Sequence, residues 1–232
     1  KEKFENFDEP KEIIENCIKQ QRKLLSGFKG NKKVNMKKWK EAQNPNQFAI
    51  SLIGEPTLYP KLAELILEIR KRKATSFLVT NGLNPLVLEK LEKKNCLPTQ
   101  LYLSLNSSNK NGYEKWHKSN KKEAWKLFNK SLLVMKKLKA KTKTKRVIRM
   151  TLVKNENMKE SDILGYAKLI KKAMPDFLEI KAFMSVGYSR KRFGYEKMPF
   201  HHEIMLFAKK LVAQLIKLGL KKYKILDEKI ES

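Results

Sequence analysis

The sequence predicts an α/β fold in which parallel strands alternate with helices, as in a doubly wound sheet or a partial (β/α) barrel. Three observations predict this fold. Short apolar runs alternate with segments of helical period along most of the chain. Most of the strand-like runs end in polar residues. No GxGxxG or GxxxxGK[ST] loop follows any of them, which disfavours a dinucleotide-binding or P-loop domain.

The elements follow one another at the spacing of βα units. Asp8, Glu9 and Pro10 start a helix that Gly27 ends, and a short helix is expected over residues 35–43. No linker divides the chain, so we expect residues 1–232 to form one domain. Strands are predicted at 48–53, 76–80, 100–105, 146–153, 177–183 and 223–226. Helices are predicted at 62–69, 85–91, 124–138, 162–173 and 201–218.

The charge points to a polyanionic partner. The 232 residues contain 52 Lys and Arg against 24 Asp and Glu, a net charge of +28. Nucleic acid is the leading partner; an anionic membrane surface is a weaker alternative, and compositional bias is the neutral explanation. No apolar run is long enough to span a bilayer and no signal peptide is recognisable. Two cysteines give no disulfide framework, so a cytoplasmic location is expected.

Alternate strand residues predict one apolar and one polar face. The face toward the helices would be apolar: Phe48, Ile50, Leu52, Leu101, Leu103, Ile148, Met150, Leu152, Leu178, Ile180 and Ala182. The opposite face would line the lumen: Ser51, Tyr102, Ser104, Asn106, Arg149, Thr151, Glu179 and Lys181. The three charged residues either form one ion network or face a polar ligand. Because polar positions cluster at the carboxyl ends of the strands, we favour the ligand.

Several motifs resemble one enzyme family. Residues 51–60 read SLIGEPTLYP and are similar to the SLSGEPTLYP signature of the radical S-adenosylmethionine (SAM) enzymes that make wyosine bases in tRNA. The resemblance extends from Asp8 to Asp227. Further matching segments are 24–31, 77–82, 98–105, 149–154 and 179–190.

The resemblance implies a partial (β/α)6, TIM-like barrel with SAM and a [4Fe-4S] cluster at its carboxyl mouth. The implied reaction condenses pyruvate carbons with N1-methylguanosine at position 37 of tRNA(Phe), forming 4-demethylwyosine. The reduced cluster would cleave SAM to a 5′-deoxyadenosyl radical, which takes a hydrogen from the N-methyl group. The implied partners are the tRNA anticodon loop, pyruvate and a flavodoxin- or ferredoxin-type electron donor, and a monomer is expected.

The same resemblance assigns the SAM residues. Ile53 replaces the first glycine of the family's GGEP motif, and Asn106 stands where relatives often carry Asp. The methionine amino group would be held by Gly54, Glu55 and Pro56. The ribose or carboxylate would meet Asn81, Ser104 and Asn106, and the adenine would lie near Thr151 and Val153.

Substrate contacts are expected around the last lumen strand. Lys181 is the candidate catalytic residue, either through a Schiff base with pyruvate or through a non-covalent contact with its carboxylate. Arg149 and Glu179 would also face the substrate. The anticodon loop is expected to meet Tyr188, Ser189, Arg190 and Arg192, because cations and aromatics alternate there. A second, weaker basic patch is residues 141–146, which otherwise form a solvated face.

The family's CxxxCxxC cluster motif is absent from the sequence. Its ligands, and those of a second cluster, are expected upstream of residue 1, so this chain would have no metal ligands and no radical activity by itself. Cys17 and Cys96 are expected to be structural. Two alternatives stay open: a non-catalytic RNA-binding barrel without a cluster, and a metabolic barrel enzyme for a phosphorylated sugar, which would explain neither the charge nor the motifs.

Overall fold

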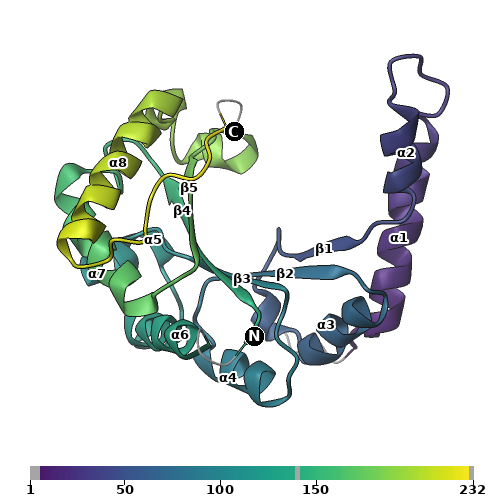
Figure 1. Cartoon of the computed structure of the whole chain (residues 1–232), viewed down its shortest axis with the longest axis horizontal. Helices are drawn as coiled ribbons and strands as arrows, with labels where there is room; N and C mark the ends of the chain where they lie inside the picture. The colour runs from purple at the N-terminus through teal and green to yellow at the C-terminus, as the bar shows by residue number, and fades with distance from the viewer. Residues whose placement is uncertain (1–5, 139–141, 230–232) are drawn as a thin grey trace.

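Five parallel strands form one curved sheet in the computed structural model, which describes residues 6–138 and 142–229. The strands are β1 (Gln47–Ile50), β2 (Thr75–Thr80), β3 (Gln100–Ser104), β4 (Lys145–Leu152) and β5 (Phe177–Ala182). Their spatial order, β1-β2-β3-β4-β5, is also their order in the chain, with β1 and β5 at the two ends of the arc (Figure 1). A doubly wound sheet reverses direction at a switch point, so this order identifies a partial barrel.

Most of the helices lie on the outer, convex side of the sheet, and the first two stand beside β1 at the end of the arc (Figure 1). The helices are α1 (Pro10–Ser26), α2 (Met36–Ala42), α3 (Leu62–Lys71), α4 (Pro85–Lys93), α5 (Lys110–His117), α6 (Ala124–Leu138), α7 (Ile163–Ala173) and α8 (His201–Lys217). All were predicted except α5, a short polar helix that Asn109 caps by accepting a hydrogen bond from the Gly112 N–H. None of the helices in the described ranges is both long and apolar enough to cross a bilayer.

The two faces of β3 and β4 differ as predicted, whereas the residues of β5 from Leu178 to Ala182 are half-buried on both faces. Leu101, Leu103, Ile148 and Met150 are fully buried beneath the helices, while the polar residues between them are half-buried on the other face. The prediction for Leu52 was wrong. Strand β1 ends at Ile50, and the Leu52 side chain is 95% exposed because its backbone has already turned away, with φ at 91°.

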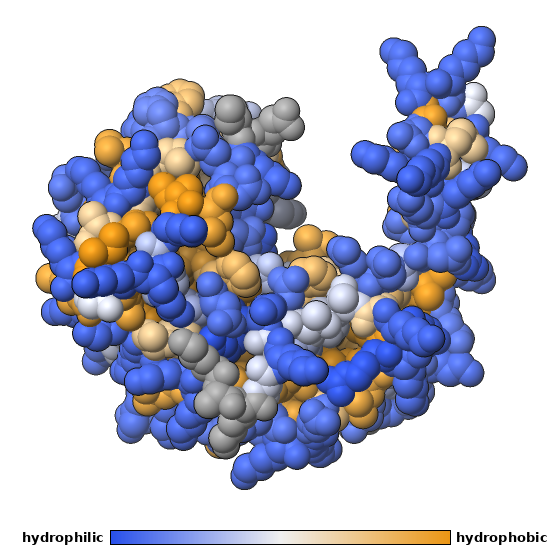
Figure 2. All heavy atoms as spheres, viewed as in Figure 1, coloured by the Kyte–Doolittle hydropathy of each residue, from blue (hydrophilic) through white to orange (hydrophobic). Residues whose placement is uncertain are grey.

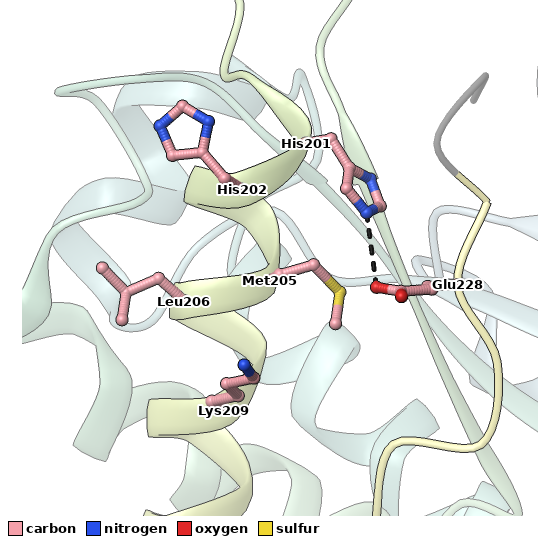
Figure 3. A pocket seen from close by; sticks show the side chains of 6 residues that line it. All are labelled: His201, His202, Met205, Leu206, Lys209 and Glu228. Carbon is pink, nitrogen blue, oxygen red and sulfur yellow. Dashed lines mark hydrogen bonds and ion pairs between the residues drawn. The ribbon is translucent and has the colours of Figure 1, made fainter.

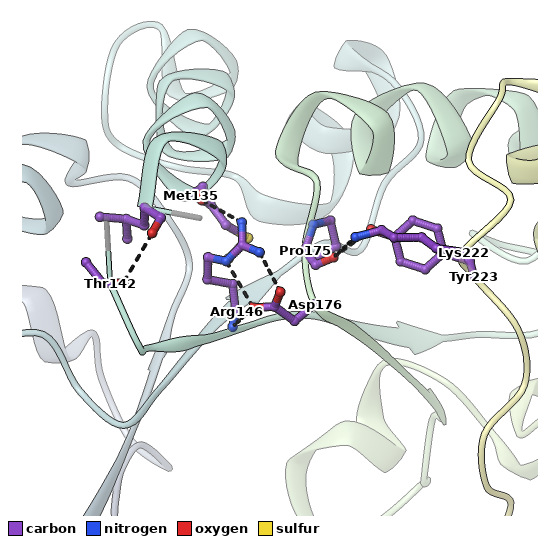
Figure 4. Close-up of polar contacts among 8 residues, drawn as sticks. Met135, Thr142, Arg146, Pro175, Asp176, Lys222 and Tyr223 are labelled. Atoms are coloured by element: carbon purple, nitrogen blue, oxygen red, sulfur yellow. Dashed lines mark hydrogen bonds and ion pairs between the residues drawn. The ribbon is translucent and has the colours of Figure 1, made fainter. Parts of the chain in front are cut away.

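The sixth predicted strand, over residues 223–226, does not form. This segment is irregular, and among residues 6–138 and 142–229 no strand pairs with the free edge of β5. Tyr223 is buried, and its hydroxyl donates to the carbonyl of Pro175, 2.6 Å away (Figure 4). Ile225 and Leu226 remain exposed. The apolar residues of the tail therefore anchor one turn at the start of β5 and do not continue the sheet.

A buried ion pair joins the second residue of β4, Arg146, to Asp176, which directly precedes β5. Arg146 is only 1% exposed and donates from Nε and Nη2 to the two carboxylate oxygens of Asp176, at 3.0 and 2.6 Å (Figure 4). It also donates to the carbonyl of Met135 on α6, at 3.1 Å. The predicted basic patch at 141–146 is thus wrong for Arg146, which is a core residue; Lys141 lies outside the described residues.

Candidate functional site

The strand register brings the polar residues of three strands into two adjacent rows. Ser104 on β3 pairs with Arg149 on β4, and Arg149 pairs with Glu179 on β5. Two residues further along, Thr151 pairs with Lys181. Because all strands are parallel, both rows lie toward the carboxyl edge of the sheet, where parallel α/β folds build their sites.

Glu179 lies between two cations. Its Oε2 is 3.5 Å from Nε of Arg149, and its Oε1 is 3.9 Å from Nζ of Lys181. Burial, with a further contribution from the Glu179 carboxylate, raises the pKa of Tyr102 on the same face. The ion network weighed from the sequence is therefore present. The side chains of Arg149 and Lys181 are still 31% and 39% exposed, so both cations remain open to an anionic ligand.

Glu55 is occupied by hydrogen bonds from its own chain. Thr57 donates to Oε1 from its backbone N–H at 3.1 Å and its hydroxyl at 2.6 Å, and Thr80 donates to the same oxygen at 2.6 Å. The backbone N–H of Asn81 donates to Oε2 at 2.8 Å. The carboxylate thus ties the turn after β1 to the end of β2, and Pro56 starts a single 3-10 turn, Pro56–Leu58, between them.

Sequence reasoning missed the hydroxyl partners of this carboxylate. Thr57 and Thr80 are both buried, and Asn84 donates from its amide to the Thr57 hydroxyl at 2.6 Å. The contact with Thr57 could have been predicted in part, because a threonine two residues after Glu55 can donate a local hydrogen bond to the glutamate side chain. The contact with Thr80 spans 25 residues and has no local signature.

The turn before Glu55 has strained and open backbone. Gly54 has φ at 77°, and a Cβ added there would meet no atom within 4 Å. Leu52 has φ at 91°, a region that costs a branched side chain about 1–3 kcal/mol. Leu52 and Ile53 are 95% and 90% exposed. A glycine facing open space lets a ligand approach the backbone closely at Gly54.

A buried asparagine, which the sequence reasoning also missed, holds the ends of β3 and β4 together. Asn157 donates from Nδ2 to the carbonyls of Asn106 and Thr151, each at 3.0 Å, and accepts from the N–H of Val153 at 2.7 Å. Asn106 in turn accepts from the N–H of Thr151 at 3.1 Å. The Val153 N–H is therefore engaged within the protein, and Asn106 contributes its side-chain oxygen to the strand end.

Three polar groups at this edge keep hydrogen-bonding capacity. The amide nitrogen of Asn81 and the hydroxyls of Ser104 and Thr151 make no hydrogen bond to the described part of the chain, and all three residues are half-buried. Their donors come from β2, β3 and β4. This donor set, together with the open turn at Gly54, fits an elongated polar ligand such as SAM, with its amino acid and ribose.

The residues do not fit a [4Fe-4S] cluster. Cys17 is exposed on α1, whereas Cys96 is buried after α4 and its Sγ donates to the Lys94 carbonyl at 3.0 Å. Within residues 6–138 and 142–229, no three His, Cys, Asp or Glu side chains are grouped to hold a metal ion. A cluster needs three or four ligands, so none of the chemistry below is assigned to a cluster on these residues.

The predicted RNA segment follows β5 as two 3-10 turns, Gly187–Lys191 and Tyr195–Lys197. Tyr188 is 85% exposed, with the Lys191 ammonium 5.2 Å from its ring centre. Arg190 donates to the Ser185 carbonyl at 3.1 Å, and Arg192 is exposed. Ser189 is different, because its hydroxyl bonds within the turn to the carbonyls of Met184 and Val186. Three of the four predicted residues thus face solvent.

A cavity of about 420 Å³ lies elsewhere, and none of the predicted site residues lines it. Figure 3 shows His201 pointing toward Glu228 of the C-terminal segment, at 3.4 Å, while His202 points away from both. The remaining lining residues are Met205, Leu206 and Lys209 of α8.

Comparison with known proteins agrees with this geometry. A family model described as the radical SAM superfamily matches residues 32–167, and one described as wyosine base formation matches residues 172–232. The S-adenosyl-L-methionine-dependent tRNA 4-demethylwyosine synthase of Pyrococcus horikoshii is 46% identical over 209 residues, 90% of this chain and 59% of that protein. The chain therefore spans about three fifths of that relative's length.

Two further relatives are covered more fully. The tRNA 4-demethylwyosine synthase of Methanocaldococcus jannaschii is 37% identical over 227 residues, 97% of this chain and 67% of that protein. The solved structure of TYW1 with a lysine-pyruvate adduct bound superposes with a TM-score of 0.80 at 34% identity, covering 98% of this chain and 68% of that one. The chain belongs to the radical SAM superfamily and, within it, to the tRNA 4-demethylwyosine synthase family.

Proposed function

We propose that this chain is the SAM- and tRNA-binding barrel of an enzyme that condenses pyruvate with N1-methylguanosine at position 37 of tRNA(Phe) to form 4-demethylwyosine. The observation that carries the proposal is the carboxyl edge of the sheet, where free polar groups from three strands lie beside exposed cations in a member of the synthase family. Membership of the radical SAM superfamily implies SAM and a [4Fe-4S] cluster as cofactors.

SAM would lie along the carboxyl edge. The open backbone around Gly54 and Pro56 would receive its ammonium group, with Glu55 holding that turn in place. Asn81, Ser104 and Asn106 would face its carboxylate and ribose. Thr151 and Val153 would lie nearest the adenine. When bound, SAM supplies the sulfonium from which the radical of this enzyme class is made.

The remaining polar residues would bind and orient the substrates. Arg149 and Lys181 offer two partly exposed cations next to Glu179, and these would bind the carboxylate of pyruvate. Glu179 would keep the two cations apart and oriented, and the buried apolar face behind them excludes water from the strand side. The guanine base would then stack near the turn at Tyr188, which is the most exposed aromatic residue of this segment.

Lys181 is expected to form a Schiff base with pyruvate, because the related TYW1 structure at 34% identity holds a lysine-pyruvate adduct. The lysine amine would add to the keto carbon of pyruvate and water would leave. Borohydride treatment of the complete enzyme with labelled pyruvate, followed by peptide mass mapping, should label Lys181. Lys181→Arg keeps the charge but cannot form the imine, so this variant should lose both the label and nearly all activity. An unlabelled Lys181 together with an arginine variant that keeps most of the activity would instead show that this residue acts through its charge.

The exposed arginines after β5 are expected to bind tRNA phosphates. Replacing Arg190 and Arg192 with glutamine should weaken tRNA binding and lower the slope of log K against log salt by about 1.5, since each phosphate contact contributes about 0.7–0.9. In the complete, cluster-loaded enzyme, formation of 5′-deoxyadenosine and of the tricyclic base should fall at low tRNA concentration and recover at saturation.

The matched control replaces Lys90 and Lys93, two exposed cations of α4, with glutamine. This variant should bind and turn over tRNA as the parent does. If the arginine variant keeps the parent affinity and salt slope, the RNA site lies elsewhere. If the parent binds tRNA but neither binds SAM nor forms 5′-deoxyadenosine, the chain is the non-catalytic RNA-binding barrel.

A further inference from the structure

The segment between α1 and the end of α2 forms a strongly basic projection. We define the basic arm as residues 22–40. It contains eight Lys and Arg residues and no Asp or Glu, and all eight cations are exposed: Arg22, Lys23, Lys29, Lys32, Lys33, Lys37, Lys38 and Lys40. Figures 1 and 2 show the arm standing beside β1, apart from the barrel, with a mostly hydrophilic surface.

Hydrogen bonds between α1 and α2 hold the arm in a defined conformation. Trp39 of α2 donates from its indole to the carbonyl of Leu25 on α1, at 2.9 Å. Arg22 donates to the carbonyl of Gln43 at 2.8 Å and to the side chain of Asn44 at 2.9 Å, which fixes the far end of α2. Asn35 caps α2 by accepting from the Lys38 N–H at 3.1 Å. These bonds set the spacing of the cations.

The charge of the arm is not neutralised by the chain itself. Elsewhere, lysines such as Lys154 and Lys197 pair with carboxylates at 2.7 and 2.8 Å. Within the described residues, no ion pair joins a cation of the arm to a carboxylate; Lys29 instead lies 5.8 Å from the centre of the Trp39 ring. Eight like charges in this short segment repel one another. This repulsion destabilises the arm unless a polyanion binds there.

Apolar side chains accompany these cations. Leu24, Phe28 and Met36 are 72%, 53% and 40% exposed on the same projection. An exposed aromatic ring among lysines offers a base-stacking surface beside phosphate contacts. A bilayer surface could also accept such a mixture, but the chain belongs to a family of tRNA-modifying enzymes, and this favours RNA.

We infer that the basic arm is a second RNA-binding surface, which contacts the phosphate backbone of the substrate tRNA independently of sequence. This inference rests on the proposed function. The arm adjoins β1, whereas the Tyr188–Arg192 segment follows β5, so the two surfaces lie at opposite ends of the sheet (Figure 1). A folded RNA that bridges them would be held at two separate points.

The test replaces four lysines of the arm together: Lys32→Gln, Lys33→Gln, Lys37→Gln and Lys38→Gln. Affinity for tRNA, measured by fluorescence anisotropy at several salt concentrations, should fall about tenfold or more, and the salt slope should fall by about 3. Circular dichroism and the SAM affinity should not change. Glutamine and lysine have similar helix propensities, so the arm should remain folded.

The control removes the same charge from exposed lysines on α4 and α6: Lys90, Lys93, Lys136 and Lys137. The inference is overturned if the two quadruple variants bind tRNA equally well. If the arm variant binds as the parent while the Arg190 and Arg192 variant does not, the arm inference fails and the proposed function stands. If the four substitutions abolish binding to phosphatidylserine vesicles and leave tRNA binding intact, the arm binds membranes and the RNA inference is wrong.

Discussion

Replacing Asp176 with alanine is expected to lower the free energy of unfolding by about 3 kcal/mol, because it leaves a buried guanidinium without its counter-ion. Arg146 is 1% exposed, its Nε and Nη2 donate to this carboxylate, and its backbone N–H donates to the same group. Chemical denaturation followed by circular dichroism measures the loss. The control is Glu114→Ala, which removes a pair with Lys110 in which both side chains are more than half exposed. That change should cost less than about 1 kcal/mol. Equal losses in the two variants would contradict a buried pair.

The effect of Asp176 should also depend on pH. Burial raises the pKa of this carboxyl, but the hydrogen bonds and charge of Arg146 outweigh burial, so the folded-state pKa lies below its ordinary value. A carboxyl with a lowered pKa stabilises the fold above its unfolded pKa of about 4, and the stabilisation is lost as the pH falls through the folded value. The free energies of unfolding of the parent and of Asp176→Asn should therefore differ most at neutral pH. The two values should approach one another as the pH falls into the acid range. A difference that grows in acid would contradict this linkage.

Replacing Glu55 with glutamine is expected to weaken SAM binding about 10- to 100-fold. The carboxylate accepts four hydrogen bonds, and a glutamine amide would turn an NH₂ group toward one of those donors. One unsatisfied buried group costs about 1–3 kcal/mol, which is the source of the expected range. The loss would come through the displaced turn at Gly54 and the Asn81 backbone, since the carboxylate itself is occupied within the protein.

Isothermal titration of the complete enzyme with SAM measures this effect. Glu89→Gln, a half-buried position on α4 away from the carboxyl edge, is the matched control and should bind SAM as the parent does. The melting temperature without SAM should fall because one donor loses its partner, and the additional shift on adding SAM should shrink in Glu55→Gln, which separates the effect on folding from the effect on binding. A parent-like SAM affinity in this variant would show that the Glu55 network does not position the cofactor.

The local pattern of the sequence was sufficient for the order of strands and helices, the apolar and polar faces of β3 and β4, and the position of the polar edge. These features repeat every two or 3.6 residues, so neighbouring side chains reveal them. The SLIGEPTLYP segment similarly led to the family. The short helix α5 was missed because it has only eight residues, is polar on average and buries only Tyr113.

The tertiary structure decided how the polar residues are used, since their partners are distant in the chain. Glu55 meets Thr80, 25 residues away, Arg146 meets Asp176, 30 away, and Asn157 meets Asn106, 51 away. The sequence pattern does not predict such long-range contacts. The presence of a basic or acidic residue alone does not show whether it forms a buried ion pair or lies in solvent. The missing sixth strand has the same origin: residues 223–226 have strand-like composition, but the hydrogen bond of Tyr223 to Pro175 directs the chain away from the edge of β5.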